Sequence, residues 1–425
     1  MSPARPTVQV IGRRLEASDH ELRDFLTRAA QPFEWFEAGT AEAEGLLAEK
    51  GASGAELPVV IDGDEVTVAA TIRLLAEKWR VREPPRRRAY DIVIVGAGPA
   101  GLAAAVYAAS DGLATAVVDH EVPGGQASHT SMIENFFGFP EGIGGAELAR
   151  LAGRQAEKFG AELLLLRGID RTRRADEGFV LDLEGDHEIF APLMIAATGM
   201  AWRRLEAAGV QELLGRGVYY GAGRSEAAQC GSDDVVVVGA GNSAGQAVMN
   251  LAGSGARVKM LVRGDSLAKS MSAYLIERIE AQPLIEVRLE TEVESVEERD
   301  GVLEAVVVKD RSGGGERLPA AALFICIGGA PCTEWASGSG VRVGPGGFVL
   351  TGPDLILGGE RPDEWALDRD PLALETSVPG LFAAGDIRHG SPRRVGGAVG
   401  DGAMAVALAH RIEERLPHPG RSERL

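Results

Sequence analysis

The sequence predicts an α/β protein with two doubly wound, parallel-sheet units and a smaller α/β unit in front of them. Two segments, residues 90–120 and 234–264, each read as an apolar strand, a glycine-rich turn, a helix and a second strand. Their apolar runs do not alternate with polar residues, which is typical of strands buried on both faces of a parallel sheet. Strand and helix patterns also alternate through residues 1–80, and these predict the smaller unit.

Length and composition fit a soluble protein of two or three domains. The chain has 425 residues, of which 45% are apolar and 25% charged, and a domain averages about 150 residues. The net charge of −18 disfavours binding to nucleic acid or to anionic membranes. The chain has neither a long apolar span nor the apolar core of a signal peptide, and none of its three cysteines lies in a CxxC. We therefore expect a cytoplasmic protein without structural disulfides.

The N-terminal unit, residues 1–80, is expected to contain strands and helices in alternation. The predicted order is a strand at 7–12, a helix at 18–30, a strand at 33–39, a helix at 40–51, two short strands within 57–68, and a helix at 69–79. Ser18 or Asp19 is expected to cap the first of these helices. The N-terminal unit is therefore predicted to have the order βαβαββα.

Residues 81–88 read as a linker. Two prolines there disfavour helix and sheet, and the neighbouring arginines are typical of a solvated stretch. An alternative is that these arginines clamp the N-terminal unit or the acidic face of a partner.

The first glycine-rich turn has the spacing of a dinucleotide-binding fingerprint. Gly96 allows the tight turn, Gly98 allows close approach of a pyrophosphate, and Gly101 allows the helix to pack on the strand. The helix N-terminus then offers N–H donors to the phosphates. Asp119 ends the following strand, where it can accept a hydrogen bond from a ribose hydroxyl. The pattern predicts a Rossmann-like unit.

The second turn repeats the pattern with Gly239, Gly241 and Ala244. Its second strand leads to Arg263 instead of an acid, and an arginine can pair with a 2′-phosphate. This favours NADPH over NADH, and Lys269 is placed to help. Two alternatives stay open: Arg263 is only a solvated surface residue, or the second site is folded but empty.

Further motifs around the fingerprints resemble those of the two-dinucleotide-binding-domain flavoproteins, and within these the low-molecular-weight bacterial thioredoxin reductases. The motifs are GAGPAG (96–101), PGGQ (123–126), IENFFGFP (133–140), AATG (196–199), GAGNSA (239–244), CIGGAP (326–331) and GLFAAGDI (380–387). The resemblance implies a discontinuous FAD-binding domain at 89–211 and 332–425, with an NAD(P)H-binding domain at 212–331 inserted in it. It also implies a homodimer.

The resemblance further implies which residues bind the two nucleotides. Those implied for FAD are Gly96, Gly98, Pro99, Ala100, Gly101, Asp119, Gly124, Gly125, Gln126, Asn135, Thr198, Gly199, Gly385, Asp386, Arg394 and Val395. Those implied for NADPH are Gly239, Gly241, Asn242, Ser243 and Ala244, and Arg263 joins them because of its place after the second strand. Asn135 would reach the flavin ring, and Arg394 would lie at its pyrimidine edge. No spacing typical of metal ligands is present.

The sequence departs from the reductase pattern at its redox centre. The two cysteines of the family's CxxC would fall near Ala222 and Ser225, so these positions carry no thiol. Reduction of a substrate disulfide needs two thiols within reach of each other. Cys230 comes too late in the chain, and Cys326 lies in an apolar strand and is expected to be buried. A functional thiol at Cys332, or a Cys230–Cys332 pair, stays open.

The N-terminal unit resembles a thioredoxin or glutaredoxin fold. Leu57-Pro58-Val59 is similar to the segment whose proline is cis in that fold, but the first strand-to-helix turn, GRRLEASDH, has no cysteine. Neither module therefore carries a thiol in its redox position.

The expected function is an FAD-dependent NAD(P)H oxidoreductase that uses NADPH, or NADH, and has no CxxC dithiol. The acceptor would be O₂, ferredoxin or flavodoxin, a quinone, or another small molecule. His129 follows PGGQ and either lies near the flavin or is structural. Two alternatives stay open: a flavin-bound redox sensor or docking protein, and a thioredoxin-disulfide reductase that uses unrecognised thiols.

Overall fold

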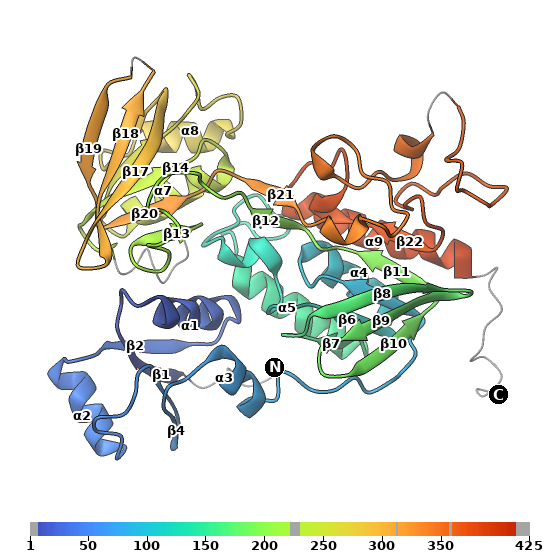
Figure 1. Cartoon of the computed structure of the whole chain (residues 1–425), viewed down its shortest axis with the longest axis horizontal. Coiled ribbons are helices and arrows are strands. Elements are labelled where there is room, and N and C mark those ends of the chain that lie inside the picture. The colour runs from blue at the N-terminus through green and yellow to red at the C-terminus, as the bar shows by residue number, and fades with distance from the viewer. Residues whose placement is uncertain (1–6, 222–229, 312, 357–358, 414–425) are drawn as a thin grey trace.

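In the computed structural model, which describes residues 7–221, 230–311, 313–356 and 359–413, the chain forms three α/β units. Figure 1 shows the N-terminal unit in blue, lying against both larger units. The two larger units lie side by side and are joined by a narrow two-stranded crossing.

The N-terminal unit has the predicted order of elements. They are β1 (Val8–Gly12), α1 (Ala17–Arg28), β2 (Phe33–Glu37), α2 (Ala41–Glu49), β3 (Val59–Asp62), β4 (Glu65–Thr67) and α3 (Ile72–Lys78). The sheet order is β2-β1-β3-β4, with β1 parallel to β2 and antiparallel to β3. The Leu57–Pro58 peptide bond is cis.

The predicted cap of α1 is wrong. Ser18 and Asp19 lie inside the helix, and the N-cap residue is Glu16, whose side chain makes no capping hydrogen bond. Asp19 is buried and turns back toward the preceding loop, where its Oδ2 accepts a hydrogen bond from the Arg13 backbone N–H at 2.6 Å. The carboxylate therefore stabilises the turn between β1 and α1 instead of the first helical amides.

The first of the larger units is built from two separate stretches of chain. Its parallel sheet has the order β22-β11-β5-β6-β7. The strands are β5 (Ile92–Val95), β6 (Thr115–Val118), β7 (Glu162–Leu164), β11 (Leu193–Ala196) and β22 (Leu381–Ala383), and the helices are α4 (Pro99–Ser110), α5 (Gly145–Lys158) and α9 (Val395–Glu413). An antiparallel sheet of β8 (Ile169–Ala175), β9 (Gly178–Leu183) and β10 (His187–Ala191) belongs to the same unit. Because β22 pairs with β11, the chain returns to this sheet after building the second unit.

The second of the larger units repeats the parallel arrangement, with the order β13-β20-β14-β15-β16. Its elements are β13 (Val218–Tyr220), β14 (Asp234–Val238), α7 (Asn242–Gly253), β15 (Arg257–Leu261), α8 (Ala273–Glu280), β16 (Ile285–Arg288) and β20 (Ala322–Ile325). An antiparallel sheet of β17 (Thr291–Arg299), β18 (Val302–Asp310) and β19 (Gly315–Pro319) packs beside it. Leu205, Ala207 and Val210 already pack in the core of this unit, so the chain enters it before the predicted start at residue 212.

The chain crosses between the larger units at β12 (Met200–Trp202) and β21 (Gly329–Pro331), which pair antiparallel. An ion pair between Arg278 of α8 and Glu134, with an N–O distance of 2.9 Å, also spans the two units. Five short 3₁₀ helices complete the described elements: Gly125–His129, Glu334–Ala336, Pro345–Gly347, Gly352–Leu355 and Gly385–Ile387.

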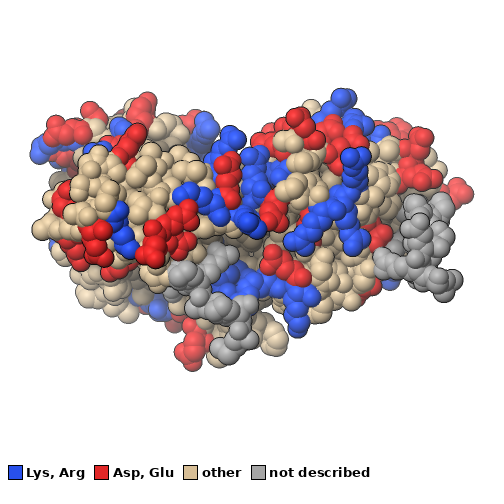
Figure 2. Space-filling view, turned by 90° about the horizontal axis from the view of Figure 1, so that it is seen from below, with Lys and Arg blue, Asp and Glu red and all other residues tan. Residues whose placement is uncertain are grey.

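The N-terminal unit and its linker pack against the rest of the molecule. Arg28 of α1 pairs with Glu121 at 2.6 Å, and Val122 is part of the N-terminal unit's apolar core. The linker is not simply solvated, because Arg82 pairs with Glu184 at 3.1 Å and the Arg86 backbone N–H donates to Glu162. On the face seen in Figure 2, acidic and basic side chains are interspersed. No helix among the described residues is long and apolar enough to span a membrane.

Candidate dinucleotide site

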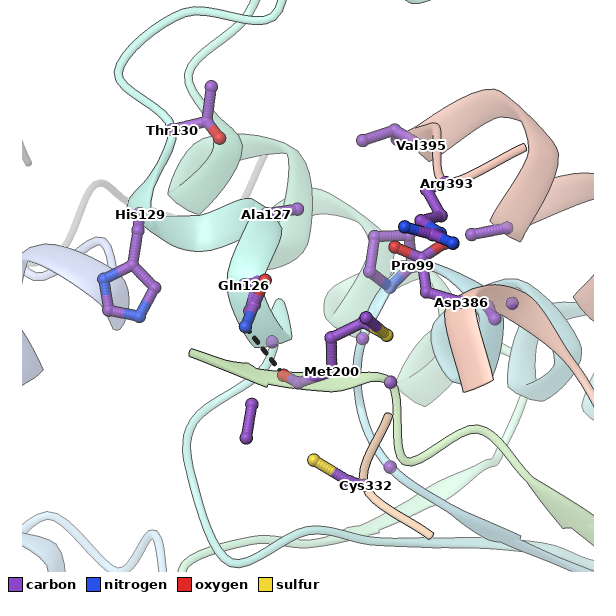
Figure 3. A pocket seen from close by; sticks show the side chains of 18 of the residues that line it. Pro99, Gln126, Ala127, His129, Thr130, Met200, Cys332, Asp386, Arg393 and Val395 are labelled. Carbon is purple, nitrogen blue, oxygen red and sulfur yellow. Dashed lines mark hydrogen bonds between the residues drawn. The ribbon is translucent and has the colours of Figure 1, made fainter. Parts of the chain in front are cut away.

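A cavity of ≈ 480 Å³ brings most of the residues expected at the FAD site into one place. Figure 3 shows Gln126 and Met200 near its middle, with His129 toward one end and Asp386 and Arg393 toward the other. The expected residues that line the cavity are Gly96, Gly98, Pro99, Ala100, Asp119, Gly125, Gln126, Thr198, Gly199, Gly385, Asp386, Arg394 and Val395, together with Ser243 from the second fingerprint.

The first fingerprint has the geometry that each glycine predicts. Gly96 has φ +108°, and a Cβ there would lie 2.3 Å from the Ala197 carbonyl oxygen. A Cβ on Gly101 would lie 1.8 Å from the Gly96 oxygen, so this glycine lets α4 pack against β5. Gly98 is the N-cap of α4, and no atom lies within 4 Å of the position its Cβ would take. The open space at the start of α4 therefore fits a pyrophosphate approaching the helix N-terminus.

Asp119 is held in the cavity wall by two backbone donors. Its Oδ2 accepts from the Ala97 N–H at 2.6 Å, and its Oδ1 accepts from the Glu121 N–H at 2.9 Å. Burial raises the pKa of Asp119, and the two backbone hydrogen bonds oppose that shift. The carboxylate thus links the glycine-rich turn to the end of β6, where a ribose would lie.

Asp386 gives the clearest indication that a ligand binds in this cavity. Its Oδ1 is buried and has no hydrogen-bond partner among the described residues. Burial raises the pKa of its carboxyl, and the charge of Arg393 opposes that shift. A buried polar atom without a partner costs about 1–3 kcal/mol, so a ligand hydroxyl placed here would remove that cost. The N-terminus of α9, with Arg394 and Val395, lines the cavity beside it.

Helix α7, which follows the second fingerprint turn, contributes to the same cavity, whereas the glycines of that turn do not line it. A Cβ on Gly239 would lie 2.3 Å from the Cys326 carbonyl oxygen, while Gly241, the N-cap of α7, has open space. Ser243 and Gln246 of α7 line the cavity. Asn242 is engaged within the protein, because its Oδ1 accepts from the Ser272 backbone N–H at 2.7 Å.

Arg263 lies in a separate cavity of ≈ 430 Å³ beyond the end of β15. Lys269, Lys309 and Arg311 also line it, together with four acidic residues: Asp265, Glu290, Glu292 and Asp310. Lys269 is paired with Asp265 at 2.7 Å, and Arg311 is paired with Glu290. Arg263 is exposed and makes no ion pair with a described residue, which leaves its guanidinium available to an anionic group.

Some predicted residues do not line the dinucleotide cavity. They are Gly101, Gly124, Asn135, Gly239, Gly241, Asn242, Ala244 and Arg263. Asn135, which was expected to reach the flavin ring, is exposed in this arrangement of the units. Gly124 instead lines a neighbouring apolar cavity beside α4 and α5.

The structure adds residues to the site that carried no sequence signal. Met200 and Trp202 come from β12, and Gln246 and Arg393 also line the cavity. The Gln126 side-chain Nε2 donates to the Met200 carbonyl oxygen at 2.8 Å (Figure 3), which ties the turn after β6 to the crossing strand. These residues are brought together by β12 and by the packing of the two units, which no local motif encodes.

None of the three cysteines forms a disulfide. Cys230 is buried in the core of the second unit, and Cys326 is buried as expected, where burial raises the pKa of its thiol to about 12. Cys332 is half-buried and lines the dinucleotide cavity (Figure 3). Burial, and then the charges of nearby carboxylates, raise the pKa of its thiol. Ala222 and Ser225, where the family's dithiol would fall, lie outside the described residues.

Within the described parts of the chain, no group of three or more His, Cys, Asp or Glu residues is placed to hold a metal ion. The buried Asp386 oxygen, the two open helix N-termini and the glycine turns fit an extended dinucleotide instead.

Comparisons with known proteins agree with this geometry. The family model "Pyridine nucleotide-disulphide oxidoreductase" matches residues 90–402. Thioredoxin reductase of Bacillus subtilis is 32% identical over 76% of this chain and 95% of its own length. A component of the alkyl hydroperoxide reductase of Pseudomonas putida is 32% identical over 80% of this chain and 61% of its own length.

Solved structures show the same likeness. Thioredoxin reductase of T. acidophilum superposes with a TM-score of 0.67 at 26% identity, and it covers 78% of this chain and 100% of its own. Lactococcus lactis thioredoxin reductase in the FR conformation also gives 0.67, at 28% identity over 77% of this chain and 100% of its own. The chain therefore belongs to the pyridine nucleotide-disulphide oxidoreductase family and is a thioredoxin reductase-like flavoprotein oxidoreductase.

Proposed function

We propose that this protein is an FAD-dependent NADPH oxidoreductase that delivers electrons to its acceptor without a CxxC dithiol. The observation that carries the proposal is the single cavity that is lined by residues of both fingerprint helices, α4 and α7. A nicotinamide bound at α7 would then lie near a flavin bound at α4, as hydride transfer requires.

The chain's residues would divide the binding of FAD among them. Gly98 and the N-terminus of α4 would hold the pyrophosphate, and Asp119 would accept from the adenosine ribose. Asp386 would accept from a hydroxyl of the ribityl chain through its unpartnered Oδ1. Arg394 and the N-terminus of α9 would stabilise negative charge at the pyrimidine edge.

When bound, FAD supplies the redox chemistry: it takes a hydride equivalent from the nicotinamide and passes on its electrons. The protein's part is to position the two nucleotides and to keep water out of the cavity. Arg263 would select NADPH by pairing with its 2′-phosphate, with NADH as the weaker donor.

The missing CxxC argues against the usual route to thioredoxin. The sequence holds only Cys230, Cys326 and Cys332, and none of them has another cysteine within three residues. Cys230 and Cys326 are buried in the second unit, so neither is available to exchange with a substrate disulfide.

The test is an anaerobic titration of the purified FAD-loaded protein with NADPH, and separately with NADH. We expect bleaching of the flavin absorbance, faster and at lower concentration with NADPH. No bleaching with either nicotinamide would overturn the oxidoreductase proposal and favour the flavin-bound sensor or docking protein.

One observation supports a second candidate function. Cys332 lines the dinucleotide cavity, so a disulfide reductase that uses this thiol is the alternative. NADPH-dependent reduction of thioredoxin, or of an aromatic disulfide reagent, should stay near background under our proposal. Robust turnover that Cys332→Ser abolishes would favour the alternative.

We also propose that the N-terminal unit is thioredoxin-like and has lost thiol chemistry. Its βαβαββα order and the β2-β1-β3-β4 sheet support this assignment. No cysteine lies in residues 1–80. The unit would therefore serve as a structural wall or a docking surface.

A further inference from the structure

A second, smaller cavity lies between the N-terminal unit and the two larger units. Its volume is ≈ 230 Å³. Helix α1 contributes His20, Glu21 and Asp24 to its walls, and the opposite side includes Trp202 and Tyr219. This cavity exists only because the N-terminal unit is docked on the rest of the molecule.

The smaller cavity adjoins the dinucleotide cavity. His129, Trp202 and Gly221 line both of them. Figure 3 shows His129 at the end of the dinucleotide cavity that lies away from Asp386 and Arg393. A ligand in the smaller cavity would therefore lie against that end of the dinucleotide site.

Rings form much of the smaller cavity's wall. The His20 and Tyr219 rings are 4.8 Å apart, and the His129 ring meets the Trp202 ring edge-on at 5.6 Å. Aromatic walls favour a planar unsaturated ligand that stacks against them. The volume is below the range of about 300–1,000 Å³ that is usual for drug-sized ligands, so the ligand is small.

Charges in the wall disfavour an anionic ligand. Burial raises the pKa of Asp24, but its hydrogen bond with His129 and the charges of His129 and Arg28 outweigh burial and hold it at about 2. Asp24 is therefore a carboxylate at neutral pH, and Glu21 is a second acidic side chain on the same helix. Two carboxylates would repel a carboxylate or phosphate ligand.

His129 gives the cavity a polar group. Its Nδ1 lies 3.5 Å from Asp24 Oδ1, so the carboxylate orients the ring. In the protonated imidazole, Nδ1 faces Asp24 while Nε2 is a second donor, suited to a carbonyl oxygen.

The docked N-terminal unit excludes a protein acceptor from this route. A Cβ on Gly215 would lie 2.9 Å from Ala17 Cα, so the start of α1 sits tightly on the β13 side. Glu16 also pairs with Arg216 at 3.5 Å. These contacts hold α1 against the second unit, so that α1 stands between the cavity and the redox centre of a thioredoxin or a ferredoxin.

We propose that the smaller cavity binds the electron acceptor, and that the acceptor is a small uncharged quinone. This inference rests on the proposed function. Reduction of a quinone to the hydroquinone takes up two electrons and two protons. NADPH supplies both electrons and one proton as a hydride equivalent, and the second proton comes from water through His129, so NADPH + H⁺ + quinone gives NADP⁺ + hydroquinone.

The test measures binding separately from turnover. The probe is tetramethyl-1,4-benzoquinone, whose ring positions are all substituted, so that it does not add to thiols. Equilibrium dialysis with the oxidised, FAD-loaded protein should give one saturable site. Glu21→Trp, which fills the cavity from α1, should raise the Kd and the KM for this quinone by about tenfold or more. Glu42→Trp, at an exposed position on α2 outside the cavity, should change neither value.

Leu214→Trp fills the same cavity from the opposite wall and replaces Glu21→Trp if that variant does not fold. Absence of saturable binding to the wild type, or equal Kd values in wild type and filled variant, would overturn the inference. If the quinone binds and the filled variant weakens it, while NADPH fails to bleach the flavin, the binding site stands and the proposed function fails.

Discussion

At the scale of single residues, Gly96 and Gly98 are two neighbouring glycines with different tasks. Gly96→Ala should destabilise the protein by about 2–5 kcal/mol, because φ is +108° and the new Cβ would lie 2.3 Å from the Ala197 oxygen. Gly98→Ala should keep the fold, since no atom lies within 4 Å of its Cβ position, but raise the Kd for FAD about tenfold or more. Thermal unfolding and flavin content measure the two effects. A stable Gly96→Ala protein that retains FAD would contradict these assignments.

Asp386→Asn should separate stability from cofactor binding. Because burial raises the pKa of this carboxyl above its ordinary 3.8, the folded protein holds the proton more tightly than the unfolded chain. The free energy of unfolding of the apoprotein should therefore fall as pH rises above about 4. Asp386→Asn removes this ionisation, so the apoprotein variant should be more stable than the wild type at neutral pH. The variant should also bind FAD about tenfold or more weakly, since it loses a charged acceptor.

Asp401→Asn is the matched control, because this nearby carboxylate is already paired. Its Oδ2 accepts from Gly385 N–H and from Arg388 Nε, each at 3.1 Å. Its substitution should destabilise the apoprotein at neutral pH, the opposite sign to Asp386→Asn. The same sign for both would show that the apoprotein stabilises the charged form of Asp386.

Arg263→Ala should raise the Kd for NADPH by about tenfold or more and leave the Kd for NADH unchanged, because only NADPH carries the 2′-phosphate. The control is Arg257→Ala on β15, whose guanidinium is paired with Asp234 at 2.9 Å. Isothermal titration of each variant with both nicotinamides distinguishes the two arginines. An equal loss of affinity for NADPH and NADH would assign Arg263 a structural role.

At the scale of elements, the docking of α1 depends on charges at its C-terminal end. Arg28 pairs with Asp24 at 2.8 Å and with Glu121 at 2.6 Å, and its side chain is only 11% exposed. Arg28→Ala should cost about 2–3 kcal/mol, because Asp24 and Glu121 both lose the charge of Arg28. Amide hydrogen exchange in α1 should speed up accordingly.

The matched control for Arg28→Ala is Arg73→Ala on α3. Arg73 forms an i,i+4 ion pair with Glu77, and its side chain is 78% exposed. It should cost under about 0.5 kcal/mol.

Acid gives the contact between Asp24 and Arg28 a second test. With a pKa of about 2 against the ordinary 3.8, Asp24 stabilises the folded state above about pH 4, and this contribution is lost as pH falls toward 2. Docking of α1 that is insensitive to both Arg28→Ala and acid would show that these charges do not hold the helix.

At the scale of the whole molecule, the homodimer stays a prediction with a testable surface. A cavity of ≈ 610 Å³ between α4 and α5 is lined mainly by apolar side chains, of which Tyr107, Leu151 and Phe159 are each at least 40% exposed. A second copy of the chain would remove this apolar surface from water. Leu151→Glu should therefore shift the protein from dimer to monomer in sedimentation velocity.

Leu289→Glu is the control for the dimer test. Leu289 is 43% exposed, close to the 40% of Leu151, but it lies in the second unit near β16. It should leave the oligomeric state unchanged. A wild-type protein that sediments as a monomer at micromolar concentration would show the prediction to be wrong.

What the sequence determined by itself is local. Glycine spacing and apolar runs predicted both fingerprints, the strands that carry them and the burial of Cys326. These patterns act within a short stretch of chain, so they do not depend on how the units pack. The cap of α1 could not be predicted, because Asp19 bonds to a turn instead of to the helix amides. Tertiary structure alone decided that α4, α7 and α9 open onto one cavity, and that His129 and Trp202 meet α1 beside it. These contacts join residues far apart in the chain, and they depend on how the three α/β units pack together.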